Sequence, residues 1–202
     1  MMIAAAVLSL GGCASVGHDF QYQSKDSYGR DTLELGTPSA KYATMFGEPV
    51  NTMTNDTVDG KFKLIRYQYA SANLATARSR LLDLEFRNDS LNSYIYISSF
   101  DDDKTIANTE QLSQVKRGTS KNSDIFKILG KPQGMALCPS THPDFKDKCN
   151  KGTQIWKWVV MEGLSTLGSS YGAKQIEERI ISISFDKDGV VTDVDSFSNH
   201  PE

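Results

Sequence analysis

The fold is decided by the stretch Ile181-Ser182-Ile183-Ser184-Phe185-Asp186-Lys187-Asp188-Gly189-Val190. Its first half alternates large apolar residues with serine, which is the period of a strand that buries one face. The four residues from Asp186 to Gly189 are typical of a tight turn, because Gly accepts a positive φ and Asp bonds to nearby backbone. We therefore expect an antiparallel hairpin whose second strand runs from Val190 to Phe197.

The same order of elements occurs earlier in the chain. Leu82 to Phe86 alternates in the same way, turns at 87–90 and continues from Leu91 to Ser99. An aromatic strand precedes each hairpin, at 62–69 and at 154–160. Short helices are expected before these strands, and each opens at Gly-Thr and ends at Gly-x-Pro, because Gly caps a helix and Pro cannot continue it. Elements that recur in order indicate a tandem repeat.

The second copy also resembles a known family. The resemblance is carried by Leu112, Val115, Gly118-Thr119, Ile125, Leu129-Gly130-Lys131-Pro132, Trp156-Lys157-Trp158 and Ile183 to Val190. This pattern resembles the SmpA/OmlA (BamE-like) family of small outer-membrane lipoproteins, over about residues 105–197 and more weakly over about 32–100. The resemblance implies a helix that ends in Gly, a Thr-capped second helix and a three-stranded antiparallel sheet.

The predicted fold class is α+β, with two tandem BamE-like units that each pack short helices on a three- to four-stranded antiparallel sheet. The predicted divisions are a signal peptide at 1–12, a lipidated tether at 13–31, a first repeat at 32–100, a linker at 101–107 and a second repeat at 108–202. Such a pair also resembles the architecture of secreted β-lactamase inhibitory proteins, where two copies align their sheets into one concave surface.

The N-terminal segment indicates export. Residues 1–12 are apolar and uncharged, too short to span a bilayer as a helix but suited to a signal peptide. Leu10-Gly11-Gly12-Cys13 resembles a lipobox, which implies lipid (palmitate) on Cys13 and a membrane anchor. The next residues, Ala14-Ser15, favour the periplasmic face of the outer membrane over retention in the inner membrane. A buried helix, or a signal peptide cut elsewhere, is the alternative.

Two further cysteines agree with an oxidising compartment. Cys138 and Cys149 are expected to pair as a disulfide, since thiols close together in an exported chain usually do. His142 lies between them, so a metal site is the alternative, although a structural zinc needs about four ligands. We expect the disulfide and no metal.

The residues favour binding over catalysis. With 39% apolar residues, 23% charged residues and a net charge of -3, the chain lacks the basic patch of a nucleic-acid binder. His18, His142 and His200 all fall outside predicted scaffold elements, and no nucleophile or phosphate-binding motif occurs. We expect neither enzymatic activity nor a cofactor.

The expected function is that of a periplasmic protein-binding or scaffold module in envelope assembly or integrity, with a periplasmic or outer-membrane protein as partner. An inhibitor or sequestering protein for a periplasmic or secreted enzyme is the alternative. Most of the aromatic side chains on the predicted strands are expected in the core, against helices. The opposite face then provides the predicted binding residues, which are Arg66, Gln68, Lys157 and, in the loop after the second aromatic strand, Tyr171.

Overall fold

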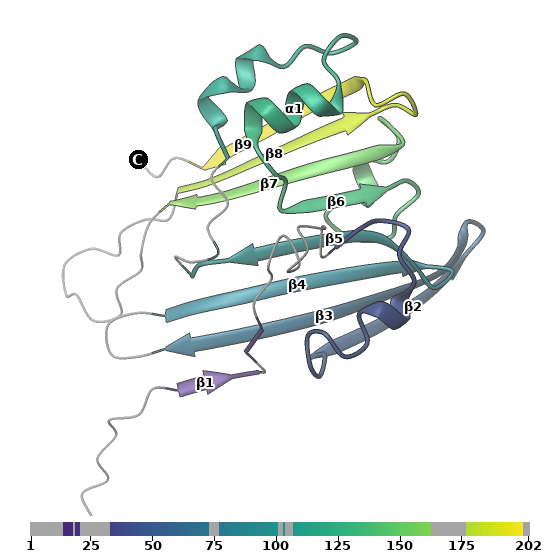
Figure 1. Ribbon diagram of the computed structural model, residues 1–202, viewed down its shortest axis with the longest axis vertical. Coiled ribbons are helices and arrows are strands. Elements are labelled where there is room, and N and C mark those ends of the chain that lie inside the picture. The colour runs from purple at the N-terminus through teal and green to yellow at the C-terminus, as the bar shows by residue number, and fades with distance from the viewer. Residues whose placement is uncertain are drawn as a thin grey trace, which may run out of the picture.

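A computed structural model describes residues 14–17, 19–20, 33–72, 77–100, 103, 107–162 and 177–199. These residues form one antiparallel sheet of nine strands, with most of the helical segments packed on one side (Figure 1). Its strand order is β1-β3-β4-β5-β6-β7-β8-β9, and β2 pairs with β3 beside β1. The strands are β1 (Ala14–Val16), β2 (Asn51–Thr57), β3 (Gly60–Ala72), β4 (Ala77–Arg87), β5 (Ser90–Ser98), β6 (Gly134–Leu137), β7 (Gln154–Glu162), β8 (Glu177–Phe185) and β9 (Val191–Asn199).

The single sheet contradicts the prediction of two tandem units with separate sheets. Strand β6 joins the two halves, because it pairs with Ser93–Ile95 of β5 on one side and with β7 on the other. The side chain of Gln133 extends this junction: its Nε2 donates to the Val159 carbonyl at 3.0 Å, and its Oε1 accepts from the Val159 N–H at 3.1 Å. Two separate sheets would leave backbone N–H and C=O groups at the edges of β5 and β7 without partners. Backbone hydrogen bonding therefore favours the joined sheet.

Helical structure is sparser than predicted. The first predicted helix is reduced to the 3-10 turn η1 (Ser39–Lys41). The second is the helix α1 (Asn122–Leu129), which ends as predicted at Gly130, with φ 78°. The described residues contain two further 3-10 segments, η3 (Thr109–Gln114) and η4 (Lys146–Lys148). No helix among the described residues is long and apolar enough to cross a membrane.

One side of the sheet, here called the helix face, carries the main apolar core. Under η1, aromatic side chains including Tyr67, Tyr94 and Tyr96 pack with leucines of β4. Under α1 and η3, both tryptophans, Trp156 and Trp158, pack with Ile125 and Leu129. This confirms that the strand aromatics mainly serve the core. Met135 of β6 contacts both clusters, so the core is continuous across the junction.

The first described residues, which fall within the predicted tether, contact the sheet. Strand β1 pairs with residues 70–72 of β3. Phe20 is 6% exposed and packs edge-on against Phe46 and Tyr67. Asp19 forms a 2.5 Å ion pair with Arg80. A short strand pair, a buried ring and an ion pair therefore hold this part of the segment against the sheet.

The predicted linker also contributes a buried contact. Asp103 accepts hydrogen bonds from Arg80 Nε at 2.6 Å, Ser98 Oγ at 2.7 Å and Tyr96 Oη at 2.9 Å. Burial, and then the neighbouring Asp103 carboxylate, raise the pKa of Tyr96 to about 12. Residue 103 is thus part of the folded body, and the other residues at 101–106 lie outside the described part of the chain.

Candidate interaction surface

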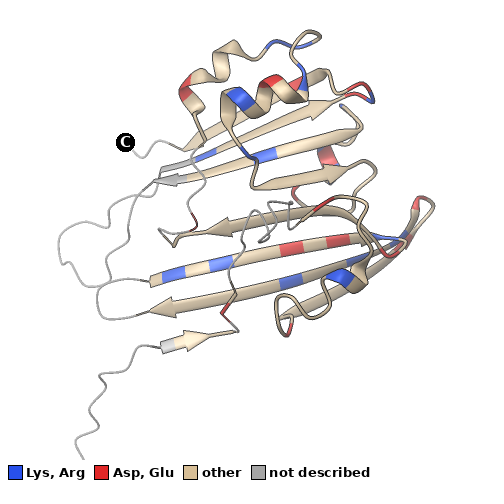
Figure 2. Ribbon diagram, viewed as in Figure 1, with Lys and Arg blue, Asp and Glu red and all other residues tan. Residues whose placement is uncertain are grey.

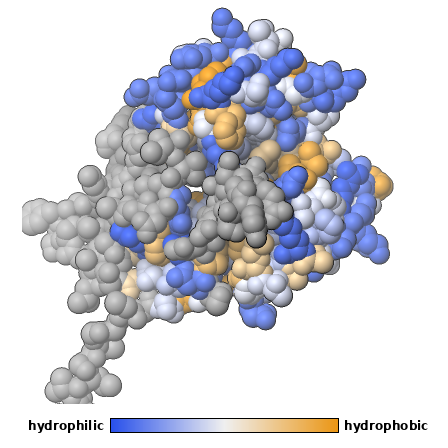
Figure 3. Space-filling model, viewed as in Figure 1, coloured by the Kyte–Doolittle hydropathy of each residue, from blue (hydrophilic) through white to orange (hydrophobic). Residues whose placement is uncertain are grey.

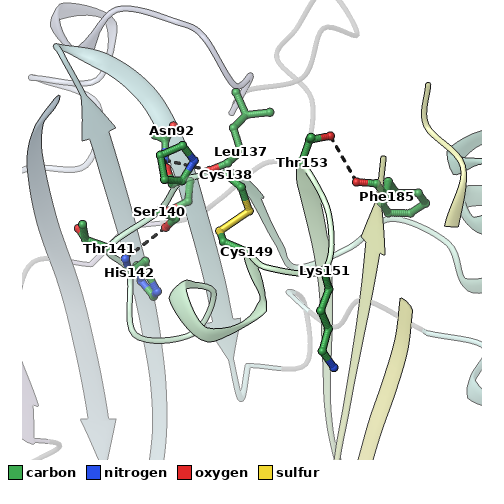
Figure 4. Close-up of a disulfide and its surroundings, with 12 residues drawn as sticks. Asn92, Leu137, Cys138, Ser140, Thr141, His142, Cys149, Lys151, Thr153 and Phe185 are labelled. Atoms are coloured by element: carbon green, nitrogen blue, oxygen red, sulfur yellow. Dashed lines mark hydrogen bonds between the residues drawn. A yellow bond between two sulfur atoms is a disulfide. The ribbon is translucent and has the colours of Figure 1, made fainter. Parts of the chain in front are cut away.

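The disulfide predicted from sequence is present and braces a loop on the other side of the sheet, here called the loop face. Cys138 and Cys149 are bonded, with Cα atoms 5.3 Å apart. Figure 4 shows the bridge closing a loop that carries Ser140, Thr141 and His142 toward the strands. Because both sulfur atoms are in the disulfide, neither cysteine is a thiolate ligand, and no group of metal ligands occurs in the described residues.

An apolar contact seats this loop on the sheet. Phe145 is 0% exposed and packs with Ile95, Ala136 and Ile155 from three neighbouring strands. Gly134 makes room for the ring, because a Cβ at this position would lie 3.0 Å from Phe145 Cζ. Phe145 thus covers this part of the loop face, as helical segments cover the helix face.

Glu85 is the first of two buried carboxylates under the loop. One oxygen accepts from Ser140 Oγ at 2.6 Å, and the other accepts from the N–H and hydroxyl of Thr141 at 2.8 and 2.7 Å. Asn92 and Ser93 donate from the neighbouring strand at 3.1 and 3.0 Å. These donors satisfy a carboxylate that would be costly to bury alone.

Asp83 is the second buried carboxylate. Arg66 holds it with two hydrogen bonds, from Nε at 2.8 Å and from the second guanidinium nitrogen at 2.6 Å. His142, which is 1% exposed, approaches it from the loop, with Nε2 3.2 Å from Oδ2. The other ring nitrogen of His142 accepts from the backbone N–H of Asp144 at 3.1 Å, so Nε2 carries the proton that faces Asp83.

The ion pair shifts the pKa values of its members. Burial acts to raise the pKa of Asp83, but the hydrogen bonds from Arg66 and His142 and the Arg66 charge outweigh it and hold that pKa below 3.8. The hydrogen bond from Arg66 to Asp83 is in turn the largest cause of a raised pKa for the guanidinium. Asp83 is therefore a carboxylate at neutral pH, and the contact is ionic.

The remainder of the loop face carries an apolar row. Leu81 lies opposite Ile97, Val159 lies opposite Ile180, and Ile180 lies opposite Phe197. Ile97 and Val159 both pack against the Phe145 cluster, and Gln133 bridges their strands. Phe197 is 58% exposed, and the other four side chains are half-buried. This apolar row crosses five strands beside the braced loop.

The predicted binding residues have different positions. Arg66, Gln68 and Lys157 project from the loop face, as their register shows. Gln68 is exposed and lies opposite Leu81, at the end of the apolar row. Lys157 is 7% exposed and forms an ion pair with Asp144 under the loop. Arg66 is bound to Asp83, while Tyr171 and Cys13 lie outside the described residues.

Charged residues lie along the strands that carry the apolar row. Strand β4 carries acidic and basic positions in alternation with tan ones (Figure 2). On β9, Asp193 is paired with Lys151 and Arg117, and Asp195 with Lys148. Sequence reasoning missed the row because its members come from different strands. The only sign of it was that Val159, Ile180 and Phe197 are apolar at positions on the face that was expected to be polar. A strand pattern that assumes one buried face does not single them out.

No family model and no curated protein matches the chain. Among solved structures, it is similar to a chain from Streptococcus mutans described as a "putative beta-lactamase inhibitor protein", with a TM-score of 0.43 and 13% identity. The alignment covers 86% of this chain and 88% of that chain. A likeness at this level does not extend to function.

Proposed function

We propose that the protein is a non-catalytic binding module that holds a protein partner on the apolar row of the loop face. The observation that carries the proposal is the alignment of Leu81, Ile97, Val159, Ile180 and Phe197 across the sheet, partly exposed and next to a braced loop. Contiguous apolar side chains rimmed by polar ones are typical of protein interaction sites.

The proposed function is non-catalytic because of how His142 is buried. His142 is the one histidine in the described residues, and it is buried with both ring nitrogens engaged. A general base must reach a substrate proton, and this imidazole is closed to solvent. Its contacts support a role in seating the disulfide loop.

We also propose that lipid on Cys13 holds the protein at the periplasmic face of the outer membrane, in the manner of the SmpA/OmlA family. Leu10-Gly11-Gly12-Cys13 supports this assignment. Strand β1 begins at Ala14, so the anchor would leave almost no spacer between lipid and sheet. Cys13→Ser should abolish palmitate labelling and release the protein from membranes, and unchanged membrane retention would contradict the anchor.

Inhibition of a soluble enzyme is the second candidate function. It is favoured by the rigidity of the surface, since the loop is held by a disulfide, a buried ring and bonds to two carboxylates. A pre-organised surface loses little conformational entropy on binding, which tight inhibitors require. An envelope scaffold and an inhibitor would use the same row but differ in partner.

Site-specific crosslinking in cells tests the proposed function. A photo-crosslinking amino acid replaces Phe197 in one strain and Phe126 in another; Phe126 is 51% exposed on α1, on the helix face. We expect a protein adduct from position 197 that position 126 does not give. An outer-membrane or periplasmic assembly protein in that adduct would support the scaffold, and a soluble hydrolase would support the inhibitor.

Binding of the captured partner then gives the quantitative test. Phe197→Glu should weaken its affinity at least tenfold, because a charge would be buried against the row, while Phe126→Glu should leave the affinity unchanged. Equal adducts from both positions, or equal effects of both substitutions, would overturn the proposal. Figure 3 shows the helix face, which lies opposite the row and on which orange apolar surface is interrupted by hydrophilic residues.

A further inference from the structure

The edge of the sheet formed by β2 is a second exposed surface, separate from the apolar row. Strand β2 pairs with β3 from Asn51↔Arg66 to Thr57↔Gly60, and all seven of its residues are exposed. Thr57 and Gly60 close a two-residue turn, so the backbone N–H and C=O groups of Thr52, Thr54 and Asp56 point away from β3. Within the described residues, these groups have no strand beside them.

Exposed apolar side chains gather on this edge. The described residues leave eight large apolar side chains exposed, and four of them lie on β1, on β2 or beside β2: Val16 at 74%, Val50 at 51%, Met53 at 49% and Val58 at 103%. An unpaired strand that also carries apolar side chains is a template for a further strand. The edge of β3 already accepts one such strand, because β1 pairs with residues 70–72 in line with β2.

The opposite edge of the sheet is protected in a way that β2 is not. Strand β9 carries Asp193 and Asp195 at alternate positions. Ion pairs with Lys151, Arg117 and Lys148 hold further charged side chains beside these two residues, and the Val194 carbonyl accepts a hydrogen bond from Arg117 at 2.8 Å. Strand β2 has Asp56 as its one charge and contains neither Lys nor Pro. Charged side chains thus protect the β9 edge from pairing with another strand, and the β2 edge lacks this protection.

We propose that β2 pairs with β2 of a second copy of this chain, antiparallel about a two-fold axis at Thr54. In this register Asp56 lies opposite Thr52 of the second copy, so no like charges meet. Val50 of each copy lies opposite Val58 of the other copy. The exposed valines at both ends of β2 are therefore covered. Thr54 meets its own symmetry mate through outward backbone groups, and the two sheets become continuous.

Charge substitution at Thr54 tests the pairing. Thr54 lies opposite Lys63 in the monomer, so Thr54→Asp gains an attractive neighbour within one chain but faces a second Asp across the axis. Sedimentation of the full chain carrying Cys13→Ser, which excludes association through lipid, should show a dimer. Thr54→Asp and Thr54→Lys should each weaken dimerisation at least tenfold, and an equimolar mixture of the two should restore it.

A matched control lies on the other edge. Ser198 of β9 is exposed and lies opposite Arg179, so Ser198→Asp makes the same kind of change there and should leave the dimer intact. Thr54→Pro removes only an outward N–H and should also give monomers. A chain that is monomeric throughout, or a dimer that tolerates Thr54→Asp and Thr54→Pro, would overturn the proposal. Strand addition by a different protein would appear as such a monomer.

Discussion

The Nε2 atom of His142 lies 3.2 Å from Oδ2 of Asp83, joining the disulfide loop to the sheet at a point where both residues are closed to solvent. Arg66 binds the same carboxylate from β3, so Asp83 receives charge-assisted hydrogen bonds from two elements. Residues 59 positions apart in the chain thus fix where the disulfide loop lies beside the apolar row.

The contact at Asp83 predicts a dependence of stability on pH. The folded-state pKa of Asp83 is lowered below 3.8, so its contribution is present above about pH 4 and is lost as pH falls through the folded pKa. Asp83→Asn should lower the free energy of unfolding at pH 7 by roughly 1–3 kcal/mol and flatten its decline below about pH 4. Denaturant unfolding at several pH values measures both effects. Asp188→Asn, in the exposed turn before β9, should change neither; an unaltered acid profile in Asp83→Asn would contradict the assignment.

The disulfide should stabilise the loop and the sheet beneath it. Replacing Cys138 and Cys149 together by Ala should lower the free energy of unfolding by about 3 kcal/mol, since an open loop has more freedom in the unfolded chain. Reduced wild-type protein should unfold at the same denaturant concentration as the variant. If removal of the bridge left stability unchanged, the seating of Phe145 and His142 alone would hold the loop.

The junction of the two sheet halves should depend on Gln133. Gln133→Ala removes two hydrogen bonds to the backbone of Val159 and should cost roughly 1–3 kcal/mol. Hydrogen exchange at the Val159 amide should accelerate, because this N–H loses its acceptor. Gln114→Ala, at an exposed position on η3, serves as the control and should be neutral. Unchanged protection of Val159 would show that the side chain does not bridge the strands.

Tyr96 should titrate late. Its pKa is raised to about 12 by burial and by Asp103, so its stabilising contribution is present below about pH 10 and is lost as pH rises from 10 toward 12. Absorbance of tyrosinate should include a step near pH 12 that disappears in Tyr96→Phe. Asp103→Asn should move this step to lower pH. A step that stays in place after both substitutions would belong to another tyrosine.

Local patterns in the sequence determined much of the secondary structure. The turn predicted at Asp186 to Gly189 is present, with Gly189 at φ 74° and the Val190 N–H donating to the Asp186 side chain at 2.9 Å. The end of α1 at Gly130 and the Cys138–Cys149 bond were also predictable. Each of these depends on residue types within a few positions, or on a chemical pairing that few cysteines permit.

Tertiary structure alone decided how these elements combine. Gly134–Leu137 is too short to be recognised as a strand, yet it pairs on both sides and merges two expected sheets into one. Asp83 and Glu85 alternate with leucines like solvent-facing residues, but they are buried because a distant loop supplies their partners. Sequence alternation determined which side chains share a face of the sheet. Whether that face meets solvent, a loop or another protein depends on backbone pairing between remote segments, which leaves no local pattern.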